Sequence, residues 1–162
     1  MGKNIDELYE SISQELSNSS TTSRRLDEIV IEHLNHNFEC ELCEIFRAEG
    51  EQIPIIVASH INCLEATLDK LMEWAQGTGD PGWEVDILLS ACKRSNFMGR
   101  WLDYVLDTAW IFRLQFERNL HFFFISALLE SRELNEEEKS RIQEANEMES
   151  FPSKAELRLM GL

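Results

Sequence analysis

The chain is at its most apolar between Trp83 and Leu129, and residues 101–112 within that stretch read WLDYVLDTAWIF. The apolar side chains there recur every three or four residues, which is the period of one face of an α-helix. Residues 120–129, LHFFFISALL, are almost entirely apolar and predict a second buried helix. The two segments predict a central hydrophobic helix, or a helical hairpin that turns at residues 117–119. No apolar run approaches the roughly 20 residues that span a bilayer.

Amphipathic segments flank this centre. Apolar residues at helical spacing predict helices at 5–16, 26–46, 64–75 and 83–91. Loops are predicted at 17–23, at 77–82 and at 93–96, where polar residues or helix breakers gather. Gly50 and Pro54 end the predicted helix 26–46, and Pro54 is expected in the first turn of the next element, where its missing N–H costs nothing. Residues 133–148 are strongly charged and predict a solvated helix or a tail. We therefore expect one all-α domain over residues 1–162, a helical bundle with a charged C-terminal helix or tail from about 133.

The composition excludes several classes of protein. The 162 residues include 30 Asp and Glu but only 15 Lys and Arg, a formal net charge of −15. Binding to DNA, RNA or an anionic membrane needs clustered Lys and Arg, so we do not expect it. Seven Gly and three Pro are too few for the turns of an all-β fold, and four Trp and nine Phe argue against disorder. The polar start lacks a secretory signal, which predicts an intracellular, cytoplasmic protein with reduced cysteines and no transmembrane segment.

The signatures of common enzymes are missing from the sequence. It contains no Gly-rich phosphate loop, no His-Glu-x-x-His, no Gly-x-Ser-x-Gly and no EF-hand loop. Acidic runs such as Glu136-Glu137-Glu138 are present, but a run of charge usually marks a solvated helix face. We expect neither an enzyme nor a bound cofactor.

One set of residues has the composition of a zinc site. Cys40-x-x-Cys43 is separated by sixteen residues from His60-x-x-Cys63, a spacing close to that of structural zinc sites. Such a site would staple two segments of the chain through thiolate ligands. The alternative is packing, because Cys40 and Cys43 fall within the predicted helix 26–46, where a free Cys behaves as a small apolar residue.

The second candidate is the segment 95–102, SNFMGRWL, at the start of the hydrophobic centre. A Gly-Arg pair that opens such a helix is unusual, because Gly disfavours helix and Arg disfavours burial. A surface groove would accommodate both residues. Gly99 would let a partner approach closely, and Arg100 would offer a planar fork of donors to a carboxylate. The alternative is a helix N-terminus with a solvent-facing Arg.

This segment resembles the first homology motif of the B-cell lymphoma 2 (Bcl-2) family, Asn-Trp-Gly-Arg, which opens the central hydrophobic helix of that family. Gly99 and Arg100 are identical to the motif. Met98 replaces its Trp, Phe97 replaces its Asn, and Asn96 is displaced by one position.

Other parts of the family pattern are weaker in this chain. Thr108 and Ala109 stand where the family has a Gly-Gly or Gly-Ala pair. Residues 26–32, LDEIVIE, are a degenerate form of the family's own death motif, and its second homology motif has no counterpart after Leu129. Such divergence is similar to that of viral members, which keep the helical bundle and lose the motifs.

The resemblance implies an apoptosis inhibitor that sequesters the death-motif (Bcl-homology 3) helices of pro-apoptotic proteins in a hydrophobic groove. Arg100 would pair with an acidic residue of the guest helix, with Gly99 and Asn96 beside it. The expected apolar lining comprises Phe46, Val57, Ile61, Leu64, Leu68, Leu88 and Ala91. An empty apolar groove also favours self-association, so a homodimer through or near the groove is expected. The resemblance further implies association with the mitochondria of a host cell.

Two other functions stay open. A zinc-stapled helical adaptor would use Cys40, Cys43, His60 and Cys63. An acidic decoy would occupy the basic site of a partner, but it needs its charges on one continuous face, whereas here they spread over every predicted helix.

Overall fold

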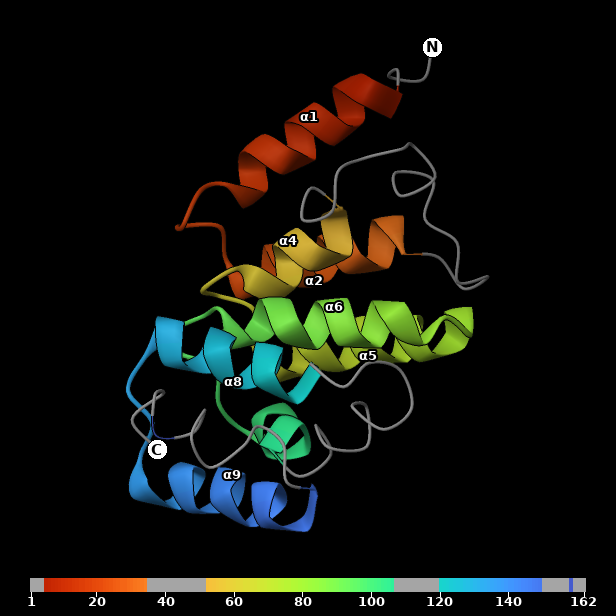
Figure 1. Cartoon of the computed structure of the whole chain (residues 1–162). Coiled ribbons are helices and arrows are strands. Elements are labelled where there is room, and N and C mark those ends of the chain that lie inside the picture. Colours follow the sequence, from red (N-terminus) through yellow and green to blue (C-terminus); the bar gives the residue numbers. More distant parts are fainter. Residues whose placement is uncertain (1–4, 35–51, 107–119, 150–157, 159–162) are drawn as a thin grey trace. The chain divides into compact units, whose positions relative to one another are not determined.

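The computed structural model describes residues 5–34, 52–106, 120–149 and 158. All regular elements in these ranges are α-helices, so the prediction of an all-α bundle is confirmed (Figure 1). None of the described helices is both long enough and apolar enough to cross a bilayer. The chain divides into two compact units, Met1–Ala91 and Cys92–Leu162. That the two form a single domain stays a prediction.

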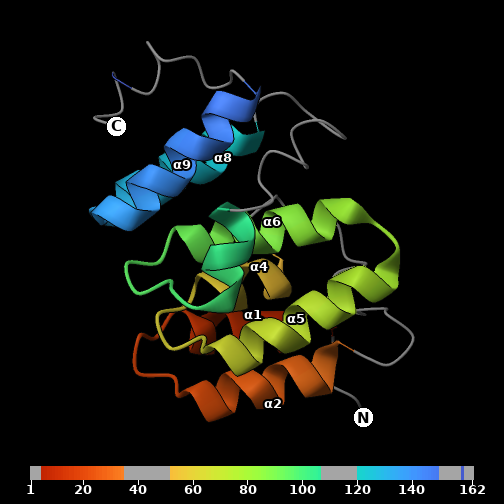
Figure 2. The same cartoon turned by 90° about the horizontal axis from the view of Figure 1, so that it is seen from below.

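The first unit contains the N-terminal helices. They are α1 (Ile5–Leu16), α2 (Ser23–His33), α4 (Ile53–Ser59), α5 (Glu65–Thr78) and α6 (Pro81–Cys92), whose last residue belongs to the second unit. Helix α2 packs against α5, and α4 contacts both α1 and α5 (Figure 2). The core of this unit is apolar, and its fully buried residues include Leu26, Ile29, Val57, Leu71 and Ile87. Burying each such side chain stabilises the unit by about 1.5–3 kcal/mol.

One polar contact fixes how α2 lies against α5. The Thr67 hydroxyl donates to Oδ1 of Asp27 at 2.6 Å, and Lys70 Nζ lies 2.9 Å from Oδ2 of the same carboxylate. Burial alone would raise the pKa of Asp27, but the bonds from Thr67 and Lys70 outweigh it and hold that pKa below its ordinary value. The charged form of Asp27 is therefore built into the α2–α5 contact.

Local sequence explains where several of these helices begin and end. The Thr22 hydroxyl caps α2 by accepting a hydrogen bond from the Arg25 backbone N–H at 3.2 Å. Pro54 lies in the first turn of α4, as predicted, where its missing N–H costs no helical bond. Gly79 ends α5 in the left-handed conformation with φ +73°, which glycine adopts at little cost.

Two predicted boundaries are wrong. The predicted helix 26–46 is not continuous, because α2 ends at His33 and Leu34 takes the non-helical angles φ −105° and ψ 88°. Leu34 is buried there, and the residues around it are His and Asn, which are weak helix formers. The predicted loop 77–82 is shorter than expected, because α5 continues to Thr78 and α6 already starts at Pro81.

The second unit contains a helix at 100–106, α8 (Leu120–Ser131) and α9 (Glu136–Glu149). The predicted interruption at 93–96 is confirmed, since α6 ends at Cys92. The predicted turn at 117–119 lies outside the described residues. Helix α9 confirms the helical alternative for the charged C-terminal segment, and its residue Ile142 is fully buried, so this helix is not solvated on every side.

Candidate functional site

The Gly-Arg pair does open a helix, as predicted. Gly99 has φ +92°, and its carbonyl oxygen accepts a hydrogen bond from the Asp103 N–H at 3.1 Å. Gly99 is therefore the N-cap and Arg100 the first residue of helix 100–106. The positive φ is a backbone conformation that L side chains rarely adopt, which explains the glycine at this position.

Arg100 lies on the surface of the second unit, beside aromatic side chains. Its guanidinium carbon is 5.3 Å from the centroid of the Trp101 ring, within the range of a cation–π contact. The Trp101 ring meets that of Tyr104 edge to face, with the centroids 5.4 Å apart. Met98 precedes the pair and is 69% exposed. We call these four residues, Met98, Arg100, Trp101 and Tyr104, the Arg100 surface; Asn96 and Gly99 beside it are also exposed.

Buried residues hold the loop that leads to this surface. Phe97, which stands where the family motif has Asn, is 1% exposed, and the guanidinium carbon of Arg94 lies 5.5 Å from its ring centroid. Arg94 is itself buried. Burial raises the pKa of the nearby Cys92 thiol to about 12, although Arg94 and Arg132 act in the opposite direction. This thiol is therefore neutral at physiological pH.

Two ion pairs involve α9, one at its start and one that joins it to helix 100–106. Arg132 makes a bidentate pair with Glu138, with nitrogen–oxygen distances of 2.9 and 2.6 Å. Arg141 donates to Oδ1 of Asp103 at 2.7 Å and to the Asp103 carbonyl oxygen at 3.2 Å. The bond from Arg132 is the main reason that the pKa of Glu138 lies below its ordinary value. Sequence reasoning missed these pairs.

Residue Glu138 also closes a capping box at the start of α9. The Asn135 side chain accepts from the Glu138 N–H at 2.8 Å, and the Glu138 carboxylate accepts from the Asn135 N–H at 3.0 Å. The Asn-x-x-Glu spacing is a known local signal for a helix start, so it was the one part of this network open to prediction.

The predicted groove lining is partly buried. Four of its residues lie inside the first unit, at 1% exposure or less: Val57, Leu68, Leu88 and Ala91. Ile61 and Leu64 are exposed, at 39% and 57%. Phe46 lies outside the described residues. A groove that combines these residues with Arg100 stays a prediction.

His60 of the predicted zinc set has another role in the structure. Its Nε2 donates to the Asn18 carbonyl oxygen at 2.9 Å, and its Nδ1 accepts from the Asn62 N–H at 3.1 Å. The Asn62 amide in turn donates to the carbonyl oxygens of Ser19 and Thr21, at 2.9 and 2.8 Å. We call His60 and Asn62 the loop clasp, because they tie the α4–α5 loop to the α1–α2 loop.

A zinc ion at His60 would have to displace one of these hydrogen bonds. Cys63 is buried, and Cys40 and Cys43 lie outside the described residues. Among the residues that the structure describes, no group of three or more His, Cys, Asp or Glu side chains could hold a metal ion.

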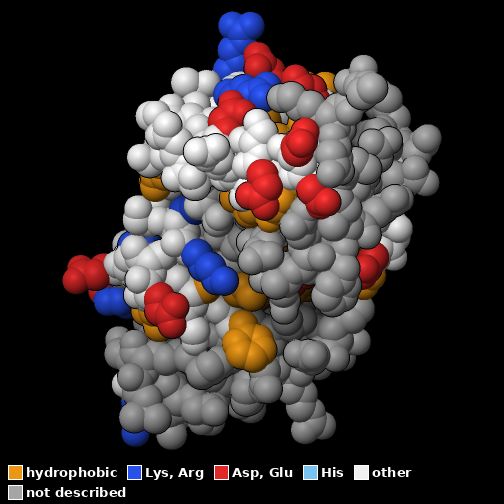
Figure 3. All heavy atoms as spheres, turned by 90° about the horizontal axis from the view of Figure 1, so that it is seen from above, with side chains coloured by type: hydrophobic (Ala, Val, Ile, Leu, Met, Phe, Trp, Pro, Cys, Tyr) orange, Lys and Arg blue, Asp and Glu red, His pale blue; other side chains and the backbone are white. Residues whose placement is uncertain are grey.

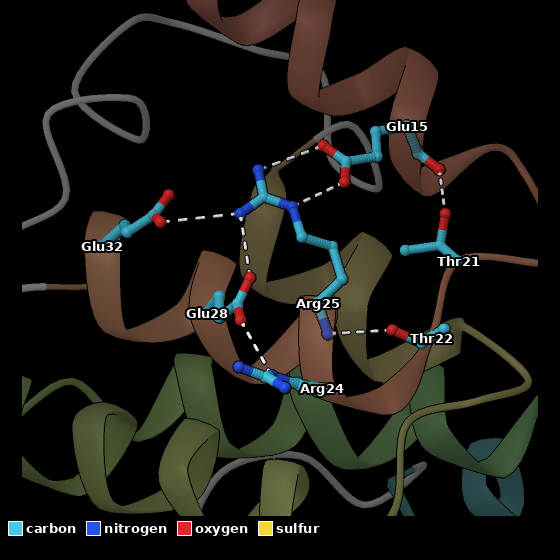
Figure 4. Close-up of polar contacts among 7 residues, drawn as sticks. All are labelled: Glu15, Thr21, Thr22, Arg24, Arg25, Glu28 and Glu32. Carbon is cyan, nitrogen blue, oxygen red and sulfur yellow. Dashed lines mark hydrogen bonds and ion pairs between the residues drawn. The ribbon is translucent and has the colours of Figure 1, made fainter.

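In the part of the chain that the structure describes, three carboxylates surround Arg25 (Figure 4). Its guanidinium lies 2.6 Å from Glu15 of α1 and 3.5 Å from both Glu28 and Glu32 of α2. The hydrogen bond to Glu15 is the main reason that the pKa of Arg25 is raised. This cluster joins α1 to α2 and is structural in character.

Acidic side chains are scattered on the face that Figure 3 shows. In its described part they alternate with apolar, basic and neutral groups. An acidic decoy needs one continuous negative face, which this side does not present in the part described.

Comparisons with protein-family models, with curated proteins and with solved structures found no match to this chain.

Proposed function

We propose that this chain is a Bcl-2-like binding module that captures an amphipathic death-motif helix and pairs an acidic residue of that helix with Arg100. By sequestering pro-apoptotic helices, it would inhibit apoptosis in the manner of a divergent viral member of the family. The observation that carries the proposal is the start of helix 100–106. There, the left-handed Gly99 is followed at once by an exposed Arg100, whose guanidinium lies against the Trp101 ring. The Trp101 ring in turn meets Tyr104, and the exposed Met98 precedes the Gly-Arg pair in the chain.

The chemistry of the Arg100 surface suits such a guest. A guanidinium fork binds a carboxylate through two parallel hydrogen bonds, and a hydrogen bond to a charged group contributes about 1.5–3 kcal/mol. Met, Trp, Tyr and Arg are the residues enriched at protein–protein interfaces and among their hot spots. Each apolar guest side chain that becomes buried adds about 1.5–3 kcal/mol. One charge pair and a few apolar anchors would therefore supply the favourable terms that must exceed the entropic cost of association.

The charge around Arg100 supports an acidic guest. Residues 93–102, KRSNFMGRWL, contain two exposed basic residues, Lys93 and Arg100, and no acidic one, in a chain whose net charge is −15. The third basic residue of the segment, Arg94, is buried. A locally basic segment in an acidic protein favours a negatively charged partner at that place and repels it elsewhere.

The test is a titration of the full chain against a panel of death-motif peptides. Arg100→Glu should weaken binding at least tenfold while the helical content, measured by circular dichroism, stays unchanged. The matched control is Arg24→Glu, the same substitution at an arginine that is 89% exposed and lies outside the basic segment 93–102. Equal losses of peptide affinity in both variants, or an unchanged affinity in Arg100→Glu, would contradict the role of Arg100. If no peptide of the panel binds the full chain, the proposed function is wrong.

The proposal includes self-association that competes with the guest. Light scattering with and without a binding peptide tests this point. We expect a dimer that dissociates as the peptide is added, and a monomer under both conditions would remove the homodimer. Recruitment to the mitochondria of a host cell would follow from its pro-apoptotic partners.

A further inference from the structure

A negative charge lies one turn beyond the cation of the proposed site. Asp103 follows Arg100 by three positions on helix 100–106, and residues with this spacing are neighbours on a helix surface, with about 5–6 Å between their Cβ atoms. The Asp103 side chain is 64% exposed. An acidic guest that approaches Arg100 therefore also approaches a carboxylate of the same sign, and such a pairing disfavours binding.

Arg141 of α9 holds this carboxylate in a two-pronged contact. It donates to Asp103 Oδ1 at 2.7 Å and to the Asp103 carbonyl oxygen at 3.2 Å. Two bonds to one residue fix the geometry of the guanidinium as well as its distance. The Arg141 side chain is only 21% exposed, so water screens the pair less than it would an open surface pair.

The start of α9 is itself fixed, which gives Arg141 a defined place. Glu138, one turn before Arg141, is held by Arg132 and by the Asn135 capping box. Ile142, next to Arg141, is fully buried. Helix α9 thus presents Arg141 to Asp103 from a packed framework.

We infer that Arg141 is a positioning residue for guest recognition, and that it sets the preference for acidic guests by neutralising Asp103 beside Arg100. The inference rests on the proposed function. It makes α9 a part of the recognition site, although the charged sequence of this helix indicated only a solvated segment. Loss of Arg141 exposes one uncompensated negative charge near the guest carboxylate, which weakens binding by about three- to tenfold at moderate ionic strength.

The peptide experiment uses a rescue by charge. In the full chain, Arg141→Ala should weaken the best death-motif peptide about three- to tenfold. The double variant Arg141→Ala with Asp103→Asn should restore the affinity to within about twofold of Asp103→Asn alone, because the charge that Arg141 neutralised is gone. Arg141→Lys, which keeps the charge, should lose less than Arg141→Ala. A loss that Asp103→Asn does not rescue would mean that Arg141 only supports α9, and would overturn the inference.

A second readout needs no peptide. Arg100→Cys places a thiol at the position of the guest's charge partner, and its reaction rates with a dianionic aromatic disulfide and with a neutral one are compared. The chain without the Arg100→Cys substitution gives the reaction rate of its own four cysteines, which is subtracted. Adding Arg141→Ala should lower the ratio of anionic to neutral rates, and adding Asp103→Asn as well should restore it. An unchanged ratio overturns the inference and leaves the proposed function intact. A lowered ratio with no peptide bound shows only that Arg141 neutralises Asp103, and it overturns both the proposed function and the role in guest recognition that rests on it.

Discussion

The Nε2 atom of His60 donates a hydrogen bond to the carbonyl oxygen of Asn18, 42 residues earlier in the chain, at 2.9 Å. The other ring nitrogen accepts from the Asn62 N–H, so the ring is used on both sides. A buried histidine that resembles a metal ligand in the sequence thus serves as a connection between two loops. Its neighbour Asn62 completes the loop clasp with two further bonds.

Removing the loop clasp should destabilise the protein. Asn62→Ala deletes the donors to the carbonyl oxygens of Ser19 and Thr21. Water can replace the bond to the exposed Ser19, but Thr21 is buried, and leaving a buried carbonyl oxygen without a partner costs about 1–3 kcal/mol. Urea denaturation followed by circular dichroism measures the loss. Gln76→Ala, an exposed change on α5, is the control and should stay within about 0.5 kcal/mol of the wild type. Equal stability of the two variants would show that the clasp contributes nothing.

The adjacent arginines 24 and 25 should differ in their contributions. Arg25→Ala removes the contacts with Glu15, Glu28 and Glu32, including the ion pair that joins α1 to α2, so we expect a loss of about 1–2 kcal/mol. The Arg24 side chain is 89% exposed and pairs with Glu28 alone, so Arg24→Ala should change the stability by less than about 0.5 kcal/mol. Thermal or urea unfolding ranks the two, and the reverse order would refute the structural role of the Arg25 cluster.

The pair of Glu138 with Arg132 should make stability depend on acid pH. The bond from Arg132 holds the folded-state pKa of Glu138 below its ordinary value of 4.5, so its contribution is complete above that value. The contribution is lost as the pH falls through the lowered folded-state pKa. Glu138→Gln should therefore be less stable than the wild type at pH 7, and the difference should shrink below about pH 4.5. Urea unfolding from pH 7 to pH 3 gives the difference at each pH, and a constant difference would contradict this assignment.

Two glycines at the end of α5 should respond in opposite directions to the same change. Gly77 is inside the helix, so Gly77→Ala should raise the free energy of unfolding by up to about 1 kcal/mol. Gly79 has φ +73°, so Gly79→Ala should lower it by about 1–2 kcal/mol. Thermal unfolding of both variants checks the sign, and a stabilising Gly79→Ala would contradict the left-handed cap.

Features that depend on neighbours in the sequence were predictable. The apolar period of α1 gave its bounds, Pro54 marked the first turn of α4, and the Gly99-Arg100 pair marked a helix start. Each of these rests on contacts within one or two helical turns, so the spacing of residue types carries the information.

Features that depend on distant partners were not predictable. Helix α2 ends at His33, and the next residue, Leu34, is buried. The burial of Leu34 depends on the surrounding fold, so the sequence near it does not predict this helix end. The contact of Arg141 with Asp103 joins residues 38 positions apart, and nothing near either residue indicates it. The two bonds of His60 similarly required the loops to be placed in space, and without them the spacing of His60 and Cys63 indicated zinc.

The left-handed end of α5 has a consequence for chirality. A Cβ atom built on Gly79 meets no heavy atom within 4 Å, so an L side chain there is disfavoured by the handedness of the backbone and not by lack of room. A D-amino acid has the mirror-image preference and adopts positive φ readily. A synthetic chain with D-alanine at this position should terminate the helix as glycine does, and it should unfold at a higher temperature because its denatured state has fewer conformations to gain.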